Sequence, residues 1–393
     1  MDVKILPGPL RGTVKAIPSK SQAHRALICA ALADGPADIV CEGTSKDIEA
    51  TEACLRALKA GGEDGVSLPC GESGSTFRFL LPIAGALGLK ASFALEGRLP
   101  KRPLSPLYEE LARHGCELSP QGSNPFTTKG KLSPGSYALD AGVSSQFVSG
   151  LLFALPLLDR DSELRLTGSV ESFPYIELTL AMLETFGVKI CFEDMAFSIP
   201  GRQKYRSPGT VRIEGDWSNA AFWLCAGAIP GNEIAVSGLD MGSRQGDKAV
   251  LGILERFGSD LRGIDIDAAD IPDLVPILSV VAAAAKGTTV IRNAGRLRIK
   301  ESDRLAAVTD MLGSLGADIR ETGDGLIIDG GRPLTGGTVS FWGDHRIAMS
   351  AAIAAVLCEE PVVIQGAEAV EKSYPAFFEE RRRLACLRNM GKK

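Results

Sequence analysis

Six stretches of the chain share one pattern, in which a short polar start is followed by about ten small apolar residues. They are KSQAHRALICAAL, ESGSTFRFLLPIAGAL, SSQFVSGLLFALPLL, GDWSNAAFWLCAGAI, DIPDLVPILSVVAAAA and GDHRIAMSAAIAAVL. Ser, Asp and Asn accept hydrogen bonds from the free N–H groups of a first helical turn, and apolar residues on nearly all faces indicate burial. The pattern predicts six capped, buried helices that begin at Lys20, Ser73, Ser144, Asp216, Asp270 and Asp344.

The six starts form two sets of three, because each start in the first set has a counterpart roughly 200 residues further on. Short β-like runs closed by glycine, such as SELRLTGS, and amphipathic helices, such as YIELTLAMLETFG, lie between them. We therefore expect two similar α/β domains of three units each. The second set starts within EGDWSNAA, which predicts a hinge near residues 212–216. A second crossing just before Lys20 would let the N-terminal strand join the C-terminal domain.

Composition narrows the class of protein. The 393 residues, 45% hydrophobic and 23% charged, suit a soluble globular protein too long for one ordinary core. The net charge of −5 argues against a general binder of nucleic acids or membrane surfaces. The nine cysteines lie mostly in apolar runs and form no CxxC pair, as is typical of reduced core residues. Neither a signal peptide nor a membrane span is evident, so we expect a cytoplasmic protein.

The usual metal and nucleotide motifs are missing from the sequence. The three histidines form no HExxH motif and no Cys/His ligand spacing, and neither GxxxxGK[ST] nor a GxGxxG that opens a helix is present. We therefore expect no metal and no cofactor. We also expect a monomer whose partners are small molecules.

Several basic residues lie near predicted helix N-termini, where positive charge is normally unfavourable. Lys20, Arg25, Arg78 and Arg346 lie close to predicted N-termini, which carry a partial positive charge. Such cations need acidic partners or bound anions. Asp344 could pair with Arg346, but the segment around Lys20 holds no evident partner, so its counter-ion would be a ligand. Each residue alone could be a solvated surface charge, whereas the repeated pattern favours an anion-binding cleft.

Acid–base chemistry has two candidate segments. In RLRIKESDRLAAV, Lys300 and Arg304 are four apart and would share one helical face, with Glu301 beside them. Two cations could hold a phosphate while the carboxylic acid donates a proton, although a charged helix start would look the same. Asp273 could be a helix cap or a base, and Arg102, which precedes a proline, is expected in extended backbone.

Ten motifs, in order along the whole chain, resemble those of one family. They are PSKSQAHRAL, CGESGSTFRFL, LPKRPLSPL, SSQFVSGLL, SFPYIELTL, EGDWSNAA, IPDLVP, LRIKESDR, GDHRIAM and EKSYPAFF. The sequence resembles the 5-enolpyruvylshikimate-3-phosphate synthase family, the 3-phosphoshikimate 1-carboxyvinyltransferases. The resemblance implies an inside-out α/β barrel fold, with two domains of three βαβαββ units each around buried parallel helices. It also implies transfer of the enolpyruvyl group of phosphoenolpyruvate to the 5-hydroxyl of shikimate 3-phosphate, through a tetrahedral intermediate, in the shikimate pathway to chorismate and aromatic amino acids.

The resemblance also implies a role for each domain. Residues 20–213 would bind mainly shikimate 3-phosphate, and residues 1–19 with 214–393 would supply phosphoenolpyruvate-binding and acid–base groups, with the active site in the interdomain cleft. The residues implied for shikimate 3-phosphate are Lys20, Ser21, Arg25, Ser144, Ser145, Gln146, Ser172, Tyr175, Asp273 and Lys300. Those implied for phosphoenolpyruvate are Lys20, Gly74, Arg102, Gln146, Arg304, Arg346 and Lys372.

The resemblance implies three catalytic residues. Asp273 would take the 5-hydroxyl proton, and Glu301 would protonate the methylene carbon and later reverse that role. Lys20 is the third, and whether Asp273, Lys20 or Lys372 handles a given proton stays open, because close charges share protons. Members of the family commonly bind glyphosate in the phosphoenolpyruvate site, and Gly74 would leave room for it.

Two departures and two alternatives accompany the resemblance. Glu72 stands where many members have asparagine, and Arg296 stands where some members have a phosphate-binding asparagine. One alternative is the related enolpyruvyl transferase that acts on UDP-N-acetylglucosamine. That enzyme has a cysteine in the loop equivalent to EGRLPKRPLSPL and Lys-Asn in place of Lys20-Ser21. The other alternative is a non-catalytic anion-binding homologue, which should have lost acidic or basic site residues.

Overall fold

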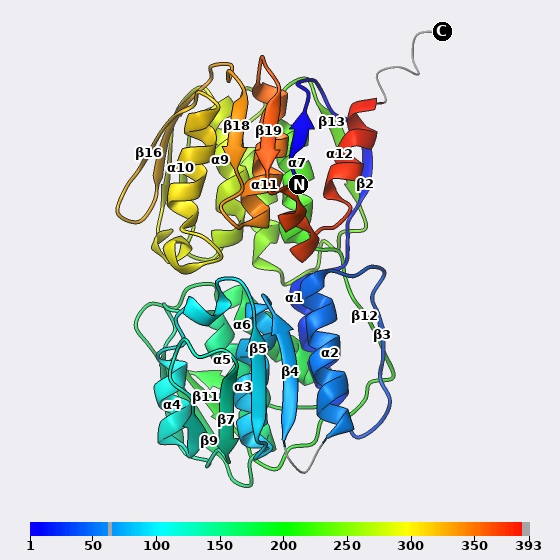
Figure 1. Cartoon of the computed structure of the whole chain (residues 1–393), viewed down its shortest axis with the longest axis vertical. Helices are drawn as coiled ribbons and strands as arrows, with labels where there is room; N and C mark the ends of the chain where they lie inside the picture. Colours follow the sequence, from blue (N-terminus) through cyan, green and yellow to red (C-terminus); the bar gives the residue numbers. More distant parts are fainter. Residues whose placement is uncertain (62–64, 387–393) are drawn as a thin grey trace. The chain divides into compact units, whose positions relative to one another are not determined.

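The computed structural model describes residues 1–61 and 65–386 of the chain. The chain divides into two compact units, which we call the N-terminal unit (Lys20–Ile213) and the C-terminal unit (Met1–Ser19 with Glu214–Lys393). Figure 1 shows the elements of each unit, coloured along the sequence. None of the described helices is long and apolar enough to cross a membrane.

The N-terminal unit has three sheets and six α-helices among its described residues. The first sheet has the strand order β4 (Val66–Gly71), β5 (Ala91–Leu95), β7 (Phe126–Gly130) and β6 (Cys116–Leu118). The second has the order β8 (Ser136–Asp140), β9 (Ser162–Thr167), β11 (Ala196–Ile199) and β10 (Cys191–Glu193). The third pairs β3 (Asp38–Val40) with β12 (Thr210–Arg212). Its helices are α1 (Lys20–Leu32), α2 (Lys46–Ala60), α3 (Gly74–Ala86), α4 (Leu107–Arg113), α5 (Ser145–Ala154) and α6 (Phe173–Thr185).

The described part of the C-terminal unit repeats this plan. The first sheet has the strand order β14 (Asp265–Asp267), β15 (Gly287–Arg292), β17 (Leu326–Gly330) and β16 (Asp318–Glu321). The second has the order β1 (Val3–Ile5), β19 (Val362–Gln365) and β18 (Gly337–Ser340). The third pairs β2 (Arg11–Lys15) with β13 (Glu233–Ser237). Its helices are α7 (Trp217–Ala228), α8 (Val250–Phe257), α9 (Val275–Ala284), α10 (Arg304–Ser314), α11 (His345–Ala354) and α12 (Phe377–Cys386).

The strand order gives each unit two helices that cross between parallel strands. In each four-stranded sheet one parallel pair adjoins two antiparallel pairs, as in β4–β5, β5–β7 and β7–β6. Parallel neighbours require a crossover, and helices α3, α5, α9 and α11 make it between β4 and β5, β8 and β9, β14 and β15, and β18 and β19. This β-α-β connection followed by an antiparallel hairpin confirms the predicted α/β fold.

Close packing surrounds the crossover helices. Helix α3 buries 12 of its 13 residues and packs against α5, whereas α7, α9 and α11 pack against one another. Gly150 of α5 allows the first contact, because a Cβ there would lie 2.4 Å from the backbone oxygen of Arg78 on α3. Helix α1 differs from the expectation, since it buries only six of its 13 residues. It lies against α2 and α6, and its Leu27, Ala30 and Ala31 line a surface groove.

The N-terminal strands belong to the C-terminal unit. Strand β1 pairs antiparallel with β19, and β2 pairs parallel with β13. Where the chain leaves and re-enters this unit, the Ser19 N–H donates to the Glu214 backbone oxygen (2.8 Å) and the Asp216 N–H donates to the Ile17 backbone oxygen (2.8 Å). The two crossing segments are thus bonded to each other just before Lys20.

Five of the six predicted helix starts are confirmed. Ser73, Ser144, Asp216 and Asp344 are N-caps whose side chains accept from backbone N–H groups of the first turn, and α1 begins at Lys20. The start at Asp270 is wrong, because α9 begins at Val275 after the short 3-10 helix η4 (Pro272–Leu274). Pro272 and Pro276 explain the shift, since a proline is tolerated in a first turn but not further along.

The cysteines follow the core prediction in part. Eight of them lie where side chains are described, and these are free thiols. Six are buried, but Cys41 is half-buried and Cys191 is exposed on β10. An apolar run in the sequence therefore did not guarantee burial at the edge of a sheet.

Candidate active site

Lys20 at the first position of α1 has a carboxylate partner. Its Nζ lies 2.8 Å from Oδ2 of Asp47, a buried residue in the first turn of α2. The expectation that the counter-ion of Lys20 is only a ligand is therefore wrong. The partner could not be seen in the sequence around Lys20, because the packing of α1 against α2 supplies it from 27 residues away.

Arg25 lies one turn further along α1 and is held by neutral oxygens. Its Nε donates to Oγ1 of Thr179 (2.8 Å), its Nη1 to the backbone oxygen of Ser21 (2.6 Å) and its Nη2 to that of Tyr175 (2.8 Å). Burial lowers the pKa of Arg25 to about 10, so the guanidinium stays charged at neutral pH. Helix α6, which carries Tyr175 and Thr179, starts after Ser172, a buried residue with φ +55°.

A second basic group of the N-terminal unit surrounds the first turn of α3. Arg78 Nη1 donates to Oε1 of Gln146 (2.8 Å), and Gln146 Nε2 donates to Oγ of Ser75 (2.9 Å). A Cβ added at Gly74 would lie 3.1 Å from Nη1 of Arg102 and 3.5 Å from Nη1 of Arg78. Two guanidinium groups therefore converge on the N-terminal end of this helix, whose partial positive charge also favours an anion.

Glu72 and Arg296, the two residues that depart from the pattern of the resembled family, lie in different units. Glu72 is exposed, and its carboxyl carbon would lie 2.7 Å from a Cβ added at Gly97, so the side chain lies against that loop. Arg296 lies in the 3-10 helix η5 (Gly295–Ile299) of the C-terminal unit and donates from Nη2 to the Ala269 backbone oxygen (3.3 Å). Arg102 has ψ 142° and confirms the extended backbone expected before a proline.

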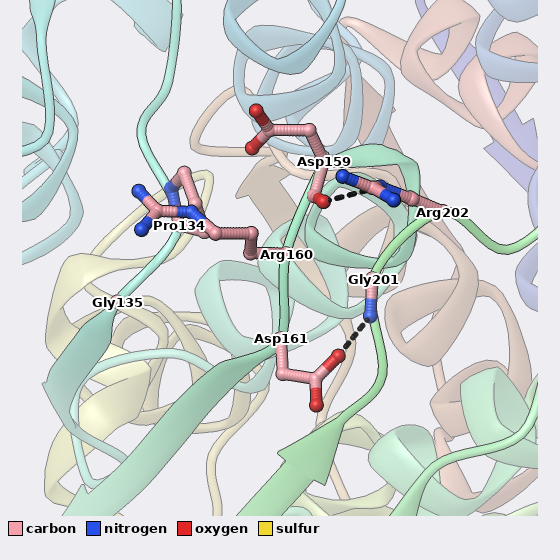
Figure 2. Close-up of a pocket in the computed structure, with 7 residues that line it drawn as sticks. All are labelled: Pro134, Gly135, Asp159, Arg160, Asp161, Gly201 and Arg202. Atoms are coloured by element: carbon pink, nitrogen blue, oxygen red, sulfur yellow. Dashed lines mark hydrogen bonds between the residues drawn. The ribbon is translucent and has the colours of Figure 1, made fainter.

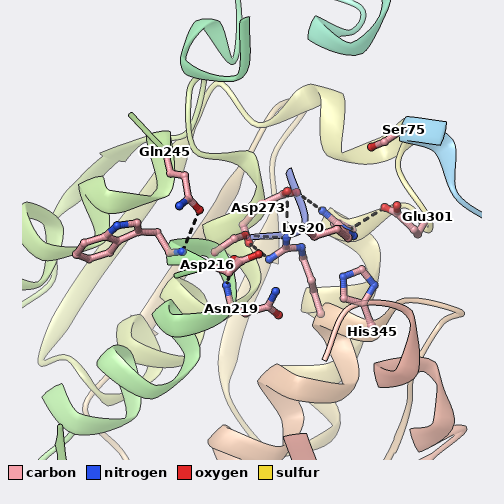
Figure 3. A network of polar contacts seen from close by, with 12 residues as sticks. Lys20, Ser75, Asp216, Asn219, Gln245, Asp273, Glu301 and His345 are labelled. Atoms are coloured by element: carbon pink, nitrogen blue, oxygen red, sulfur yellow. Dashed lines mark hydrogen bonds and ion pairs between the residues drawn. The ribbon is translucent and has the colours of Figure 1, made fainter. Parts of the chain in front are cut away.

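Arg304 is the centre of the charged cluster in the C-terminal unit. Its side chain is buried and donates to three carboxylates: Nε to Asp344 (2.7 Å), Nη1 to Asp273 (2.7 Å) and Nη2 to Glu301 (2.9 Å). Figure 3 shows Asp273 and Glu301 with their dashed contacts. A buried guanidinium that pairs with three acids holds each of them in one orientation.

Arg346 shares Asp273 with Arg304. Its Nη2 donates to Oδ2 of Asp273 (3.1 Å) and to Oγ of Ser218 (2.7 Å), and its Nη1 donates to the Asp273 backbone oxygen (3.2 Å). The expected pairing of Arg346 with Asp344 involves the backbone N–H of Arg346 (2.9 Å), because Asp344 caps α11. The guanidinium itself turns to Asp273.

Lys300 reaches this cluster from an unexpected element. It follows η5 in extended backbone, and α10 begins only at Arg304, so the predicted common helical face is wrong. Asp303 explains the difference, because it caps α10 by accepting from the Ala306 N–H (3.2 Å) and so places the helix start after Lys300. Burial lowers the pKa of Lys300 to about 8, although Asp273 opposes this shift.

Asp273 lies in η4 and is an ion-pair partner rather than a helix cap. Burial opposes its ionisation, but Arg346, Lys300 and Arg304 together hold the pKa of its carboxyl well below its ordinary value. Asp273 is therefore ionised and bonded to cations, and any loss of those cations would make it a stronger base.

Lys372 is the remaining predicted ligand of the C-terminal unit. It ends the 3-10 helix η7 (Ala367–Lys372), which packs against α11, the helix of Arg346. Tyr374 follows in the buried core, where its hydroxyl accepts from Nε1 of Trp223 (3.3 Å). This anchoring fixes the segment that carries Lys372.

Two residues that the sequence analysis did not name, Asp47 and Ser218, contact the predicted site residues, and so do two that it named without a substrate role, Arg78 and Asp344. Asp47, Arg78, Ser218 and Asp344 bond directly to predicted site residues or their partners. Arg78 and Asp344 had a signal, since both stand at helix starts in the sequence. Asp47 and Ser218 had none, because their partners lie far away along the chain.

A surface hollow of the N-terminal unit is unrelated to these clusters. It has a volume of about 570 Å³ and lies among loops (Figure 2). Its polar groups bond to one another, with Arg202 Nε donating to the Asp159 backbone oxygen (2.6 Å) and the Gly201 N–H to Oδ1 of Asp161 (3.0 Å). The lining residues, none of them a predicted site residue, are Pro134, Gly135, Asp159, Arg160, Asp161, Gly201 and Arg202.

Comparison with known proteins shows the family to which the chain belongs. The model of the family "EPSP synthase (3-phosphoshikimate 1-carboxyvinyltransferase)" matches residues 6–380. Proteins named 3-phosphoshikimate 1-carboxyvinyltransferase from Clostridium kluyveri and Clostridium acetobutylicum are each 44% identical to the chain, with 97% of both sequences covered. An EPSP synthase structure from Acinetobacter baumannii matches with a TM-score of 0.80 and 26% identity, covering 98% of each chain.

The enolpyruvyl transferase NikO from Streptomyces tendae shares the fold, with a TM-score of 0.76 at 19% identity and with 97% of this chain and 96% of that one covered. The family match and the relatives together extend over nearly the whole chain, including every charged cluster described above. The chain therefore belongs to the EPSP synthase, or 3-phosphoshikimate 1-carboxyvinyltransferase, family.

Proposed function

We propose that the chain transfers the enolpyruvyl group of phosphoenolpyruvate to the 5-hydroxyl of shikimate 3-phosphate and releases phosphate. The observation that carries this proposal is the contact of Arg304 with both Asp273 and Glu301, which brings two carboxylates with acid–base potential beside two buried arginines. The relatives support shikimate 3-phosphate as the acceptor, because they are named for that activity. UDP-N-acetylglucosamine and a non-catalytic role are not favoured.

The N-terminal unit supplies most of the groups for shikimate 3-phosphate in this proposal. Arg25 supports the assignment, because its guanidinium is held by neutral oxygens and keeps its charge for an anion. The other groups assigned to this substrate are Lys20, Ser21, Ser144, Ser145, Gln146, Ser172 and Tyr175, with Asp273 and Lys300 from the C-terminal unit. Each charged hydrogen bond would contribute about 1.5 to 3 kcal/mol to binding.

Phosphoenolpyruvate is assigned to Arg304, Arg346 and Lys372 of the C-terminal unit, with Lys20, Gly74, Arg102 and Gln146 of the N-terminal unit. The cluster at Gly74 supports this, because its two arginines and the N-terminal end of α3 suit a phosphate. Arg346 is already oriented by Asp273 and Ser218, and a substrate carboxylate would meet a guanidinium in a fixed position.

In the addition step, Asp273 takes the proton of the 5-hydroxyl as its oxygen attacks the second carbon of phosphoenolpyruvate, and Glu301 donates a proton to the methylene carbon. In the elimination step, Glu301 takes a proton back from that methyl group, the bond to the phosphate oxygen breaks, and the phosphate leaves with the proton that Asp273 held. Lys20 is assigned to stabilise the phosphate as it leaves. Anionic substrates that share the positive charge of Arg346 and Arg304 with Asp273 would raise the basicity of its carboxylate.

A two-substrate assay tests this function. Purified protein should release phosphate when phosphoenolpyruvate and shikimate 3-phosphate are both present, and should release none with either alone. Turnover with UDP-N-acetylglucosamine in place of shikimate 3-phosphate would overturn the assignment. We also propose a monomer located in the cytoplasm, which light scattering on the purified protein and fractionation of cells would test.

A further inference from the structure

Asp247 is a buried carboxylate near Arg346, and the proposed reaction gives it no role. It lies in the 3-10 helix η3 (Gly246–Ala249), which packs against α7, and its exposed fraction is 1%. A buried carboxylate is costly unless hydrogen bonds or a cation compensate for the water it has lost. Its surroundings must therefore hold that compensation.

Part of the compensation comes through Ser218 in the first turn of α7. The Ser218 side chain is hydrogen-bonded to Asp247, and its Oγ accepts from Nη2 of Arg346 (2.7 Å). A serine hydroxyl has one proton, so a hydroxyl that accepts from Arg346 can donate that proton to Asp247. The three side chains form a directed series from guanidinium to hydroxyl to carboxylate.

The charged groups that face Asp247 come from three other elements: Asp273 of η4, Arg346 of α11 and Asp216, the N-cap of α7. Burial, and then Asp273, raise the pKa of Asp247 to about 6, while Arg346 opposes the shift. Asp247 and Asp273 thus act on the same guanidinium, one through Ser218 and the other directly.

We propose that Asp247 is a positioning residue, which holds the guanidinium of Arg346 through Ser218 in its orientation toward phosphoenolpyruvate, both when the substrate binds and after Asp273 has gained a proton. This inference rests on the proposed function. Asp273 loses its charge when it takes the 5-hydroxyl proton, and its hold on Arg346 weakens at that moment. A second carboxylate, which exchanges no proton with the substrate, keeps the guanidinium in place through the cycle.

The test uses the full chain with Asp247→Asn, Ser218→Ala and the double variant. Either single change should raise the KM for phosphoenolpyruvate by about tenfold and leave kcat and the KM for shikimate 3-phosphate within about threefold. The double variant should be no worse than the more affected single variant, because both residues act through one link. Ser218→Ala keeps the test open if Asp247→Asn fails to fold.

Glu110→Gln serves as a matched control, since Glu110 is a buried carboxylate of the N-terminal unit that accepts from Arg113 and from the Ala138 N–H. It should lower the melting temperature without changing either KM. The proposal is overturned if the variants at Asp247 and Ser218 leave the KM for phosphoenolpyruvate unchanged, or if they raise both KM values equally as the melting temperature falls.

Wild-type turnover is measured first, because its absence would contradict the proposed function and not the link to Arg346. Calorimetric titration of phosphoenolpyruvate into the wild type and the variants would then still test the link. Weaker binding by the variants would support it, and equal affinities would reject it.

Discussion

Two buried arginines, Arg25 of the N-terminal unit and Arg304 of the C-terminal unit, are held in opposite ways. In the N-terminal unit, Arg25 donates to a threonine hydroxyl and two backbone oxygens. In the C-terminal unit, Arg304 donates to Asp273, Asp344 and Glu301. Both side chains are almost fully buried. Equal burial therefore accompanies different electrostatic environments.

The difference separates binding from proton transfer. A guanidinium with neutral partners keeps its full charge for a ligand, at the cost of being desolvated before the ligand arrives. A guanidinium among carboxylates is compensated within the fold and holds the carboxylates in fixed orientations, and with Arg346 and Lys300 it lowers the pKa of Asp273. The surroundings of Arg25 thus suit the binding of an anion, and the carboxylates around Arg304 suit proton transfer.

The sharpest test of this contrast is the same substitution at both arginines. Arg304→Met leaves the buried Asp344 and the partly buried Asp273 and Glu301 without their shared cation and should lower the free energy of unfolding by about 4 kcal/mol. Arg25→Met leaves only neutral oxygens and should cost about 1 kcal/mol. Urea unfolding of both variants measures the difference. Equal losses would contradict the comparison, and Arg165→Met, an exposed arginine paired with Glu163, provides the baseline.

Glu301→Gln tests the assignment of proton transfer to the C-terminal unit. The amide keeps the shape of the side chain and its contact with Arg304 but has no exchangeable acid proton, so kcat should fall by about 10³-fold. Binding of shikimate 3-phosphate, measured by calorimetry, should stay within a few-fold. Glu321→Gln is the control, because Glu321 is an acid of the same unit that pairs with Arg298. Lost binding would make Glu301 a structural residue.

Arg25→Met also tests the assignment of binding to the N-terminal unit. Loss of one charged contact with a phosphate should weaken the affinity for shikimate 3-phosphate by about 100-fold. Calorimetric titration of that substrate alone measures the change, since no turnover occurs without phosphoenolpyruvate. An affinity within threefold of the wild type would show that Arg25 does not hold the substrate.

The smallest expected effect is a pH dependence from Lys300. Its lowered pKa of about 8 means that the side chain is cationic below this pH and neutral above it. A neutral lysine no longer attracts the phosphate, so kcat/KM for shikimate 3-phosphate should fall above pH 8, by up to about tenfold per pH unit. Lys300→Arg should remove this fall, because arginine stays charged. A flat wild-type profile between pH 7 and pH 9 would contradict the assignment.

The sequence predicted those features of the site that depend only on residues close together in the chain. The caps at Ser73, Ser144, Asp216 and Asp344 were predictable, because a cap contacts N–H groups two or three residues away. The start of α9 and the position of Lys300 were not, because Pro272 and Asp303 compete with the apolar pattern over a few residues. Where a cap or a proline conflicts with the apolar pattern, the sequence alone did not show where the helix begins.

The sequence by itself determined the α/β repeat, the helices that cross between parallel strands and the residue types available for anion binding and acid–base chemistry. Only the tertiary structure decided which charges meet. Lys20 and Asp47 are 27 residues apart, Arg304 and Asp344 are 40 apart, and Arg346 and Asp273 are 73 apart. Periodicity and capping act within a few residues, whereas counter-ions are chosen by the packing of elements that are distant in the chain.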